Sequence, residues 1–185
     1  MGILSGQAIL DAIDKAFISI KPFDSKSINP ASVDLHLGEE VLQYKKWKAD
    51  GPPQAVDVKE KPKVTRWIMS EGGITLCPGQ LYLMHTVESI CTNHYVPVLD
   101  GKSSVGRLGI VIHLTAGFGD PGYSGQYTLE VTVVHPVRVY AGMPFCQMRF
   151  HEITGPIMDY QKRGHYTGEQ RGPQPSKLWM SMRRK

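Results

Sequence analysis

The residues best suited to chemistry lie in one block, Gly101 to Glu130, which reads GKSSVGRLGIVIHLTAGFGDPGYSGQYTLE. The block combines serines, a lysine, an arginine and turn glycines with two carboxylates, around two runs that are typical of strands. Hydroxyls, backbone N–H groups and cationic side chains bind phosphate oxygens, and a carboxylate can take a proton from water. The block therefore predicts a site that holds a polyanion beside a group that activates water.

Glu130 lies in a run, Gln126 to Val134, that alternates polar and apolar residues as a half-buried strand does. The alternation places Glu130 on the polar face together with Gln126, Thr128 and Thr132. If that face lines a closed pocket, the loss of water raises the pKa of the carboxyl and suits it to acid–base work. On an open face the same carboxylate is only solvated, and the run by itself leaves both interpretations open.

The stretch from Lys102 to Arg107 lies between the end of one predicted strand and the start of the next. Its serines, glycine and arginine fit a phosphate-binding turn, although they also fit an ordinary tight turn. Asp120 opens an Asp-Pro-Gly turn signal, where it either caps the turn or accepts a hydrogen bond from a sugar hydroxyl. His113 stands in an apolar run and is expected to be a hydrogen-bonded strand residue.

Several catalytic signatures are absent from the sequence. It has no zinc-deaminase pattern, no Walker A loop, no nucleophile elbow and no HExxH helix, and its seven histidines lack ligand spacing. Cys77, Cys91 and Cys146 are isolated, so they predict neither a disulfide framework nor a thiolate zinc site. We therefore expect hydrolysis without protein-bound zinc, and no residue is predicted to ligate a metal.

The elements that must position these residues are predicted to be mainly strands. A charged, proline-containing stretch from Lys45 to Lys63 is expected to be exposed. Strand-like runs separated by turn signals follow it, at residues 81–86, 95–99, 109–114, 126–134, 137–140 and 145–150. Ser32 to Leu37 alternates as a strand, and Ser5 to Phe17 has helical spacing with Ser5 as the N-cap. The pattern predicts an all-β jelly roll or barrel with a short N-terminal helix.

Length and composition predict a single domain over residues 1–185, long enough to bury a core. No signal peptide and no run near the roughly 18 apolar residues of a membrane span are present, so a cytoplasmic protein without a membrane partner is expected. The formal net charge of +4 comes partly from the terminal Arg183-Arg184-Lys185. Such a basic tail either binds nucleic acid or folds over a nucleotide.

Five segments together resemble the dCTP deaminases, the metal-free branch of the trimeric dUTPase superfamily. They are the ILSG start with its helix, INPASVDLHLG at 28–38, GKSSVGRLG at 101–109, TAGFGDPGYSGQYTLE at 115–130 and QRGPQPSK at 170–177. The resemblance covers nearly the full length. It implies a distorted jelly roll of the dUTPase-like type, assembled as a homotrimer with active sites at subunit interfaces. It also implies that residues 160–185 form a C-terminal lid, and that nucleic acid is not a partner.

The resemblance further implies roles for individual residues. Glu130 matches the catalytic glutamate, which takes a proton from the attacking water and returns it to the cytosine ring and the leaving amine. Ser103 and Arg107 match residues that organise this catalytic site, and the backbone of Ala116 helps to place the water. Asp120 matches the carboxylate near the sugar. The other substrate-binding residues implied are Lys102, Ser104, Val105, Gly106, Thr128, Leu129, Gln147, Tyr160, His165 and Gln170.

The implied activity is hydrolytic deamination of dCTP to dUTP and ammonia in pyrimidine deoxynucleotide biosynthesis. Gly117-Phe118 is similar to the pair in members that continue to dUMP and pyrophosphate, which favours the dUMP-forming type and leaves the deaminase-only type open. Mg²⁺ bound mainly through the triphosphate is the implied cofactor, without zinc. The ligands implied are dCTP and dUTP, with dTTP as a candidate inhibitor. The alternatives are a dUTPase without deaminase activity, for which Glu130 has no evident use, and a non-catalytic nucleotide-binding trimer.

Four features depart from the usual pattern of this family. Lys102 stands where arginine is more common, His165-Tyr166 stands where Lys-Tyr is usual, and one extra residue precedes Gln170. His165 would bind phosphate in a pH-dependent way, unlike lysine. Gly119 stands where an aliphatic residue is usual.

Overall fold

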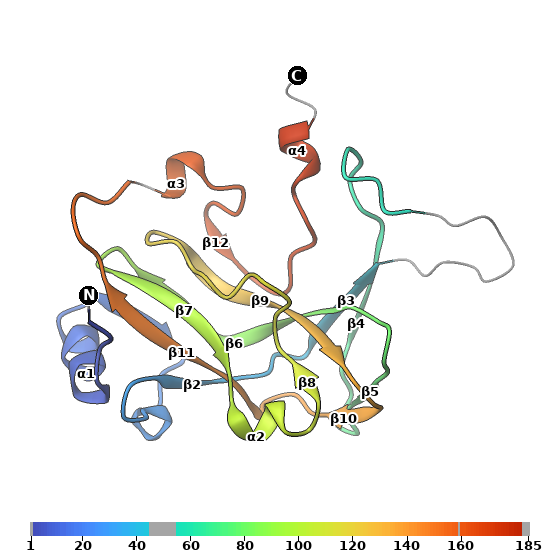
Figure 1. Ribbon diagram of the computed structural model, residues 1–185, viewed down its shortest axis with the longest axis horizontal. Helices are drawn as coiled ribbons and strands as arrows, with labels where there is room; N and C mark the ends of the chain where they lie inside the picture. Colours follow the sequence, from blue (N-terminus) through green and yellow to red (C-terminus); the bar gives the residue numbers. More distant parts are fainter. Residues whose placement is uncertain (1, 45–54, 159, 183–185) are drawn as a thin grey trace, which may run out of the picture.

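The computed structural model describes residues 2–44, 55–158 and 160–182, and its strands form three sheets around one core (Figure 1). The largest sheet contains β1 (Ile18–Lys21), β3 (Glu40–Tyr44), β4 (Val64–Ile68), β6 (Tyr82–Thr92), β8 (Ile110–Val111), β9 (Ser124–Val133) and β12 (Glu169–Gln170). The second contains β2 (Val33–His36), β7 (Tyr95–Gly101) and β11 (Pro144–Glu152). The third pairs β5 (Ile74–Leu76) with β10 (Val137–Val139). The prediction of an all-β fold is confirmed, but the sheets do not close into a barrel.

The helices are short. They are α1 (Gly6–Asp14), α2 (Ser103–Gly106), α3 (Tyr160–Arg163) and α4 (Trp179–Met182), with one 3₁₀ turn, η1 (Ser25–Ser27). The predicted N-terminal helix is confirmed, since the Ser5 hydroxyl accepts a hydrogen bond from the Ala8 N–H at 3.3 Å and Ile9 is fully buried. It ends earlier than predicted because the chain turns at Ala16, which has a positive φ of 56°.

Strand β9 lies in the largest sheet between β6 on one side and the short strands β8 and β12 on the other, and it carries the predicted alternation. Leu129, Val131 and Val133 are buried, whereas Thr128 and Glu130 are partly exposed. Strand β6 pairs with it antiparallel, with Leu83 opposite Glu130. A strand held between neighbours is a rigid support, so side chains on its polar face are fixed in direction.

Other predicted boundaries shift. The run at 81–86 extends as β6 to Thr92, and within the run at 109–114 only Ile110 and Val111 form a strand, β8. Strands β1, β3, β4, β5 and β12 were not predicted, since their runs are short or weakly alternating. Of the charged stretch at 45–63, residues 55–63 are mostly exposed as expected, whereas 45–54 and the basic terminus at 183–185 lie outside the described residues.

His85, on β6, is a buried histidine packed against the backbone of Gly38. Its Nε2 accepts a hydrogen bond from the Glu40 N–H at 3.2 Å, and its Nδ1 lies 2.9 Å from the Thr86 carbonyl. This arrangement requires the neutral ring with the proton on Nδ1. Burial is the main reason that the pKa of His85 lies below its usual value.

A histidine whose pKa is lowered by folding stabilises the protein above its ordinary pKa, and that stability is lost as the pH falls through the folded value. We therefore expect the melting temperature to fall between about pH 7 and pH 5. The fall should be smaller in His85→Gln, whereas His94→Gln, which changes an exposed histidine, should behave like the parent. In a chain of this length, about 1 kcal/mol corresponds to about 2–4 °C. Calorimetry at several pH values checks this, and equal pH dependence in all three proteins would contradict it.

Candidate functional site

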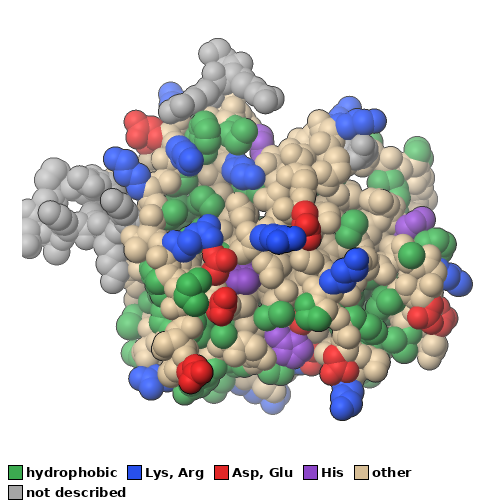
Figure 2. Space-filling view, turned by 180° about the vertical axis from the view of Figure 1, so that it is seen from behind, with side chains coloured by type: hydrophobic (Ala, Val, Ile, Leu, Met, Phe, Trp, Pro, Cys, Tyr) green, Lys and Arg blue, Asp and Glu red, His purple; other side chains and the backbone are tan. Residues whose placement is uncertain are grey.

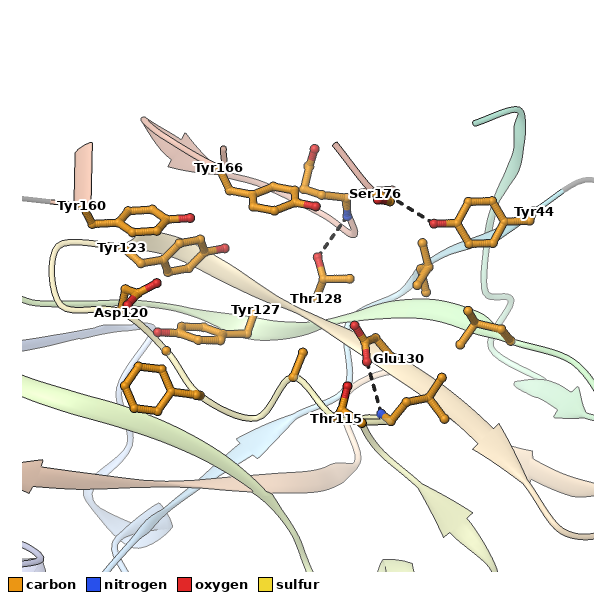
Figure 3. Close-up of a pocket in the computed structure, with 17 residues that line it drawn as sticks. Tyr44, Thr115, Asp120, Tyr123, Tyr127, Thr128, Glu130, Tyr160, Tyr166 and Ser176 are labelled. Atoms are coloured by element: carbon orange, nitrogen blue, oxygen red, sulfur yellow. Dashed lines mark hydrogen bonds between the residues drawn. The ribbon is translucent and has the colours of Figure 1, made fainter. Parts of the chain in front are cut away.

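A cavity of about 470 Å³ lies over the polar face of β9 (Figure 3). Three parts of the chain that are far apart in sequence supply most of its walls: strand β9, the loop at residues 114–123, and the C-terminal tail at residues 160–176. Leu81 and Leu83, at the start of β6, also line it. Tyr44 of β3 closes one end. The volume falls within the range of small-molecule sites, and the lining mixes aromatic rings with a few polar groups.

Glu130 points into this cavity from β9 (Figure 3). Its Oε2 accepts a hydrogen bond from the backbone N–H of Leu114 at 3.2 Å, which ties the carboxylate to the loop that begins there. Thr115 and Ala116 follow in the same loop and also line the cavity. One carboxylate oxygen is therefore held, and the other remains available to a ligand or a water molecule.

Asp120 lies on the same loop and faces the other end of the cavity. Backbone hydrogen bonds fix this loop to its surroundings: Gly119 donates to Pro97 at 2.8 Å, and Leu99 donates to Gly117 at 2.7 Å. Phe118 stands between these anchors with 67% of its surface exposed, and it also lines the cavity. The structure thus brings the two carboxylates singled out from the sequence, Glu130 and Asp120, into one site.

The C-terminal tail runs along the polar face of β9. The part of it that lies against β9 begins with β12, where Gln170 pairs in parallel with Gly125. Three backbone N–H groups then donate at alternate residues: Gly172 to Gln126 Oε1 at 2.7 Å, Gln174 to Thr128 Oγ1 at 3.0 Å, and Ser176 to the Tyr44 hydroxyl at 3.2 Å. The hydroxyl of Thr128, predicted to contact substrate, therefore accepts a hydrogen bond from the tail.

Aromatic rings form much of the cavity wall. Tyr123 packs edge-on to Tyr127, with ring centroids 4.8 Å apart, and Tyr160 lies 6.1 Å from Tyr123 in a similar arrangement. Burial raises the pKa of Tyr123, Tyr127, Tyr160 and Tyr166. These phenols therefore stay protonated at neutral pH and act as hydrogen-bond donors.

The predicted phosphate motif does not reach this cavity. Residues Lys102 to Arg107 form α2 and its ends, beside β8, at the lower edge of the molecule in Figure 1. The Lys102 ammonium forms an ion pair with Asp34. Val105 is buried, and the remaining motif residues are exposed: Ser103, Ser104, Gly106 and Arg107.

Other predicted contact residues also lie apart from the cavity. Gln147, on β11, donates to the Gly101 carbonyl at 3.0 Å and so belongs with α2. The side chain of Leu129 is fully buried in the core. Gln170 is buried, and its amide donates to the Thr167 carbonyl at 2.6 Å.

His165 lines a neighbouring cavity of about 430 Å³, together with Arg163. The two cavities share Asp120, Tyr160 and Tyr166, so Arg163 and His165 lie just beyond the first site. The predicted bifunctionality pair is split, because Phe118 lines the first cavity whereas Gly117 is buried with its carbonyl bonded to Leu99.

Several lining residues were missed by the sequence reasoning, and Tyr44, Tyr123, Tyr127, Tyr166 and Gln174 are the main ones. No sequence motif connects Tyr44 with the tail. Tyr44 is the last residue of β3, and it meets Ser176 only because the fold places β3 beside the tail. The sequence of the tail, Gly172-Pro-Gln-Pro-Ser176, has proline at every second position, which predicts an extended segment and so could have indicated that Gln174 lies against a strand.

The face opposite to that of Figure 1 carries Lys and Arg side chains intermixed with Asp and Glu (Figure 2). Within the described residues, no group of three or more His, Cys, Asp or Glu side chains could hold a metal ion. Among the same residues, none of the helices has the length and apolar character needed to cross a membrane.

Comparison with known proteins gives consistent matches. The family model described as dCTP deaminase-like matches residues 3–153. A protein of Clostridium acetobutylicum named "dCTP deaminase, dUMP-forming" is 44% identical over 179 residues, which is 96% of each chain. A protein of Leptospira biflexa with the same name is 42% identical over 184 residues, which is 99% of each chain.

Among solved structures, the chain resembles the crystal structure of 2′-deoxycytidine 5′-triphosphate deaminase from Agrobacterium tumefaciens. The TM-score is 0.63 and the sequence identity 26%, over 82% of this chain and 48% of that one. The present chain therefore spans about half the length of that protein.

The docking of the tail on β9 depends on Gly125, which has a φ of 133° and whose missing Cβ would overlap the Gln170 backbone. We expect Gly125→Ala to displace the tail and to speed hydrogen exchange of residues 166–178. Gly142→Ala is the matched control, because Gly142 also has a positive φ, of 78°, but faces open space. Exchange followed by mass spectrometry checks this. Protection that persists in Gly125→Ala, or is lost equally in both variants, would show that this contact does not hold the tail.

Proposed function

We propose that this chain, which belongs to the dCTP deaminase-like family, hydrolyses dCTP to dUTP and ammonia and then releases dUMP and pyrophosphate at the same site. The observation that carries the proposal is the meeting of Glu130 and Asp120 in one cavity covered by the tail. The names of relatives at 42–44% identity over nearly the whole chain support the dUMP-forming type.

Deamination needs a group that moves protons beside the cytosine ring. In our proposal, Glu130 takes a proton from a water molecule while the water oxygen forms a bond to C4 of the ring. The carboxyl gives this proton to N3 of the ring, and it then moves a second proton from the new C4 hydroxyl to the departing amine. The C4–N bond breaks, the C4 carbonyl forms, and ammonia leaves. The net change is dCTP plus water giving dUTP plus ammonia. The Leu114 N–H fixes Glu130 Oε2, and the adjacent backbone at Ala116 lies where it can help to place the water.

The second step is the hydrolysis of dUTP to dUMP and pyrophosphate. We propose that Asp120 binds the sugar and so keeps the nucleotide in place between the two steps. Mg²⁺ is proposed to enter with the nucleotide, because this ion prefers phosphate oxygens and water, and it would neutralise charge on the triphosphate. The tail excludes bulk water from the cavity and strengthens the electrostatic interactions within it.

The phosphate motif is proposed to come from a neighbouring subunit of a homotrimer. Residues Ser103 to Arg107 lie outside the Glu130 cavity of their own chain and are mostly exposed. Large apolar side chains with 40–69% exposure lie near α2 and the cavity loop: Leu108, Val111, Leu114, Phe118 and Val134. Exposed apolar surface of this kind is typical of a subunit interface.

A dUTPase without deaminase activity would also use Asp120. It would leave Glu130 without a role, although the structure holds this carboxylate by a hydrogen bond from Leu114 and directs it into the cavity. Incubation with dCTP or dUTP and Mg²⁺, followed by separation of the products, distinguishes the two. Unchanged dCTP at high enzyme concentration together with conversion of dUTP would favour the dUTPase.

We expect Glu130→Gln to reduce deamination of dCTP by about 10²-fold or more, because a general base contributes about 10²–10⁴ in rate. Affinity for dCTP should change little, since the amide keeps the size of the side chain. Ammonia release and calorimetric titration with dCTP measure the two effects. Glu152→Gln, on β11 outside the cavity, serves as the control. Turnover retained in Glu130→Gln would remove this residue from its proposed role.

Mixed trimers test the subunit interface. Glu130→Gln and Arg107→Ala should each be nearly inactive alone, because each lacks one half of every site. After the two proteins are unfolded together and reassembled, sites that take Glu130 from one chain and Arg107 from the other should recover roughly a quarter of the parent activity. No recovery from a mixture that sizes as a trimer would place both residues in the site of a single chain.

A further inference from the structure

The loop position Gly119 and the ring of Tyr127 fit together at the Asp120 end of the cavity. A Cβ atom at position 119 would lie 2.8 Å from the Tyr127 hydroxyl and 2.9 Å from Pro97, closer than a real Cβ contact. The absence of a side chain at Gly119 therefore leaves the space in which the Tyr127 hydroxyl lies.

Tyr127 is on the apolar face of β9 by alternation, but its ring does not end in the core. It packs against core side chains along its length, is edged by Tyr123, and reaches the cavity wall. Figure 3 shows the hydroxyl end of the ring pointing toward Asp120. The backbone N–H of Tyr127 donates to Thr86 Oγ1 at 2.9 Å, whereas its hydroxyl makes no hydrogen bond with any described residue.

We propose that the Tyr127 hydroxyl and the Asp120 carboxylate together bind the 3′-hydroxyl of the substrate sugar, and that Gly119 makes this arrangement possible. The inference rests on the proposed function. In a 2′-deoxynucleoside 5′-triphosphate, the 3′-hydroxyl is the only free hydroxyl of the sugar, so it is the group that such a pair can recognise.

The two side chains are chemically complementary to a hydroxyl. An ionised carboxylate only accepts hydrogen bonds, so Asp120 pairs with the hydroxyl proton and leaves the oxygen lone pairs unpaired. The phenol supplies the missing donor. Burial, followed by the neighbouring Tyr123, Cys91 and Asp120, raises the pKa of Tyr127, so the phenol keeps its proton at neutral and moderately alkaline pH.

A purely structural role is the competing explanation, because the ring also contacts the core. The two explanations differ in what the oxygen atom does. If Tyr127 only fills space, then Tyr127→Phe keeps the ring and leaves nucleotide recognition unchanged. If the hydroxyl binds the sugar, the same variant loses affinity only for ligands that carry a 3′-hydroxyl.

Binding of dCTP and of 2′,3′-dideoxy-CTP in the presence of Mg²⁺ tests the proposal in the full chain. Both Tyr127→Phe and its parent would carry Glu130→Gln, so that the measurement does not depend on turnover. We expect Tyr127→Phe to weaken dCTP binding by about 3- to 10-fold, the effect of one neutral hydrogen bond, and to leave dideoxy-CTP binding unchanged. An equal effect on the two nucleotides, or no effect on either, would overturn the proposal.

Tyr82→Phe is the matched control, because it removes a buried phenol oxygen that accepts a hydrogen bond from Cys77 outside the cavity. It should leave the ratio of the two dissociation constants as in the parent. If Tyr127→Phe changes the ratio of the two dissociation constants but the chain with Glu130 intact does not convert dCTP, the proposed activity fails while this inference stands. If dCTP is converted but the ratio does not change, the inference fails alone. Failure to bind either nucleotide overturns both.

The pairing with Gly119 has a separate readout in stability. Gly119→Ala should destabilise the fold, because its Cβ meets the Tyr127 hydroxyl and Pro97. Adding Tyr127→Leu should recover part of the melting temperature lost, since it removes one of these contacts. Additive losses in the double variant would show that the two positions are independent and would contradict the role assigned to Gly119.

Discussion

The polar face of β9 determines the arrangement of this site, because its consecutive outward-facing groups have different partners. Gln126 and Thr128 accept hydrogen bonds from the tail, and Glu130, next in the same row, points into the cavity that the tail covers. The period of a strand is two residues, so a shift of one residue would turn these groups into the core and expose Leu129. The register between β6 and β9 therefore fixes the position of the tail and of the carboxylate at the same time.

The tail is suited in sequence to this one-sided docking. Gly172, Gln174 and Ser176 donate their N–H groups to the body of the protein, and the residues between them are Pro173 and Pro175. Proline has no N–H and a fixed φ, so the side of the tail that faces away from β9 presents no unpaired donor there, and the segment is already extended before it docks. Such a segment loses less conformational entropy on closing than a flexible one would.

The sequence was sufficient to predict what local pattern decides. The capped helix α1, the alternation of β9 and the importance of Glu130 and Asp120 follow from spacing and residue type, and the structure brings these two carboxylates together. It was insufficient where contacts join distant segments. The pairing of Gln170 with Gly125 leaves no local trace. The alternation predicts that Tyr127 faces the core, yet its hydroxyl lies at the cavity wall. The space for this hydroxyl comes from Gly119, which lies on a separate loop, so the strand's own sequence does not reveal it.

The position of Lys102 limits where the charge that binds a triphosphate can come from. Its ammonium is paired with Asp34 and lies beside Gln147, so much of its charge is already balanced within its own chain. Arg107 is exposed on the same short helix, and Arg163 and His165 lie beside the cavity. If the sugar is held at Asp120 and the base at Glu130, the triphosphate must extend toward an arginine, whether from the tail or from a neighbouring chain. If the neighbouring chain supplies that arginine, as proposed, the site is complete only when the tail has docked and the subunits have assembled, and nucleotide binding is then coupled to both events.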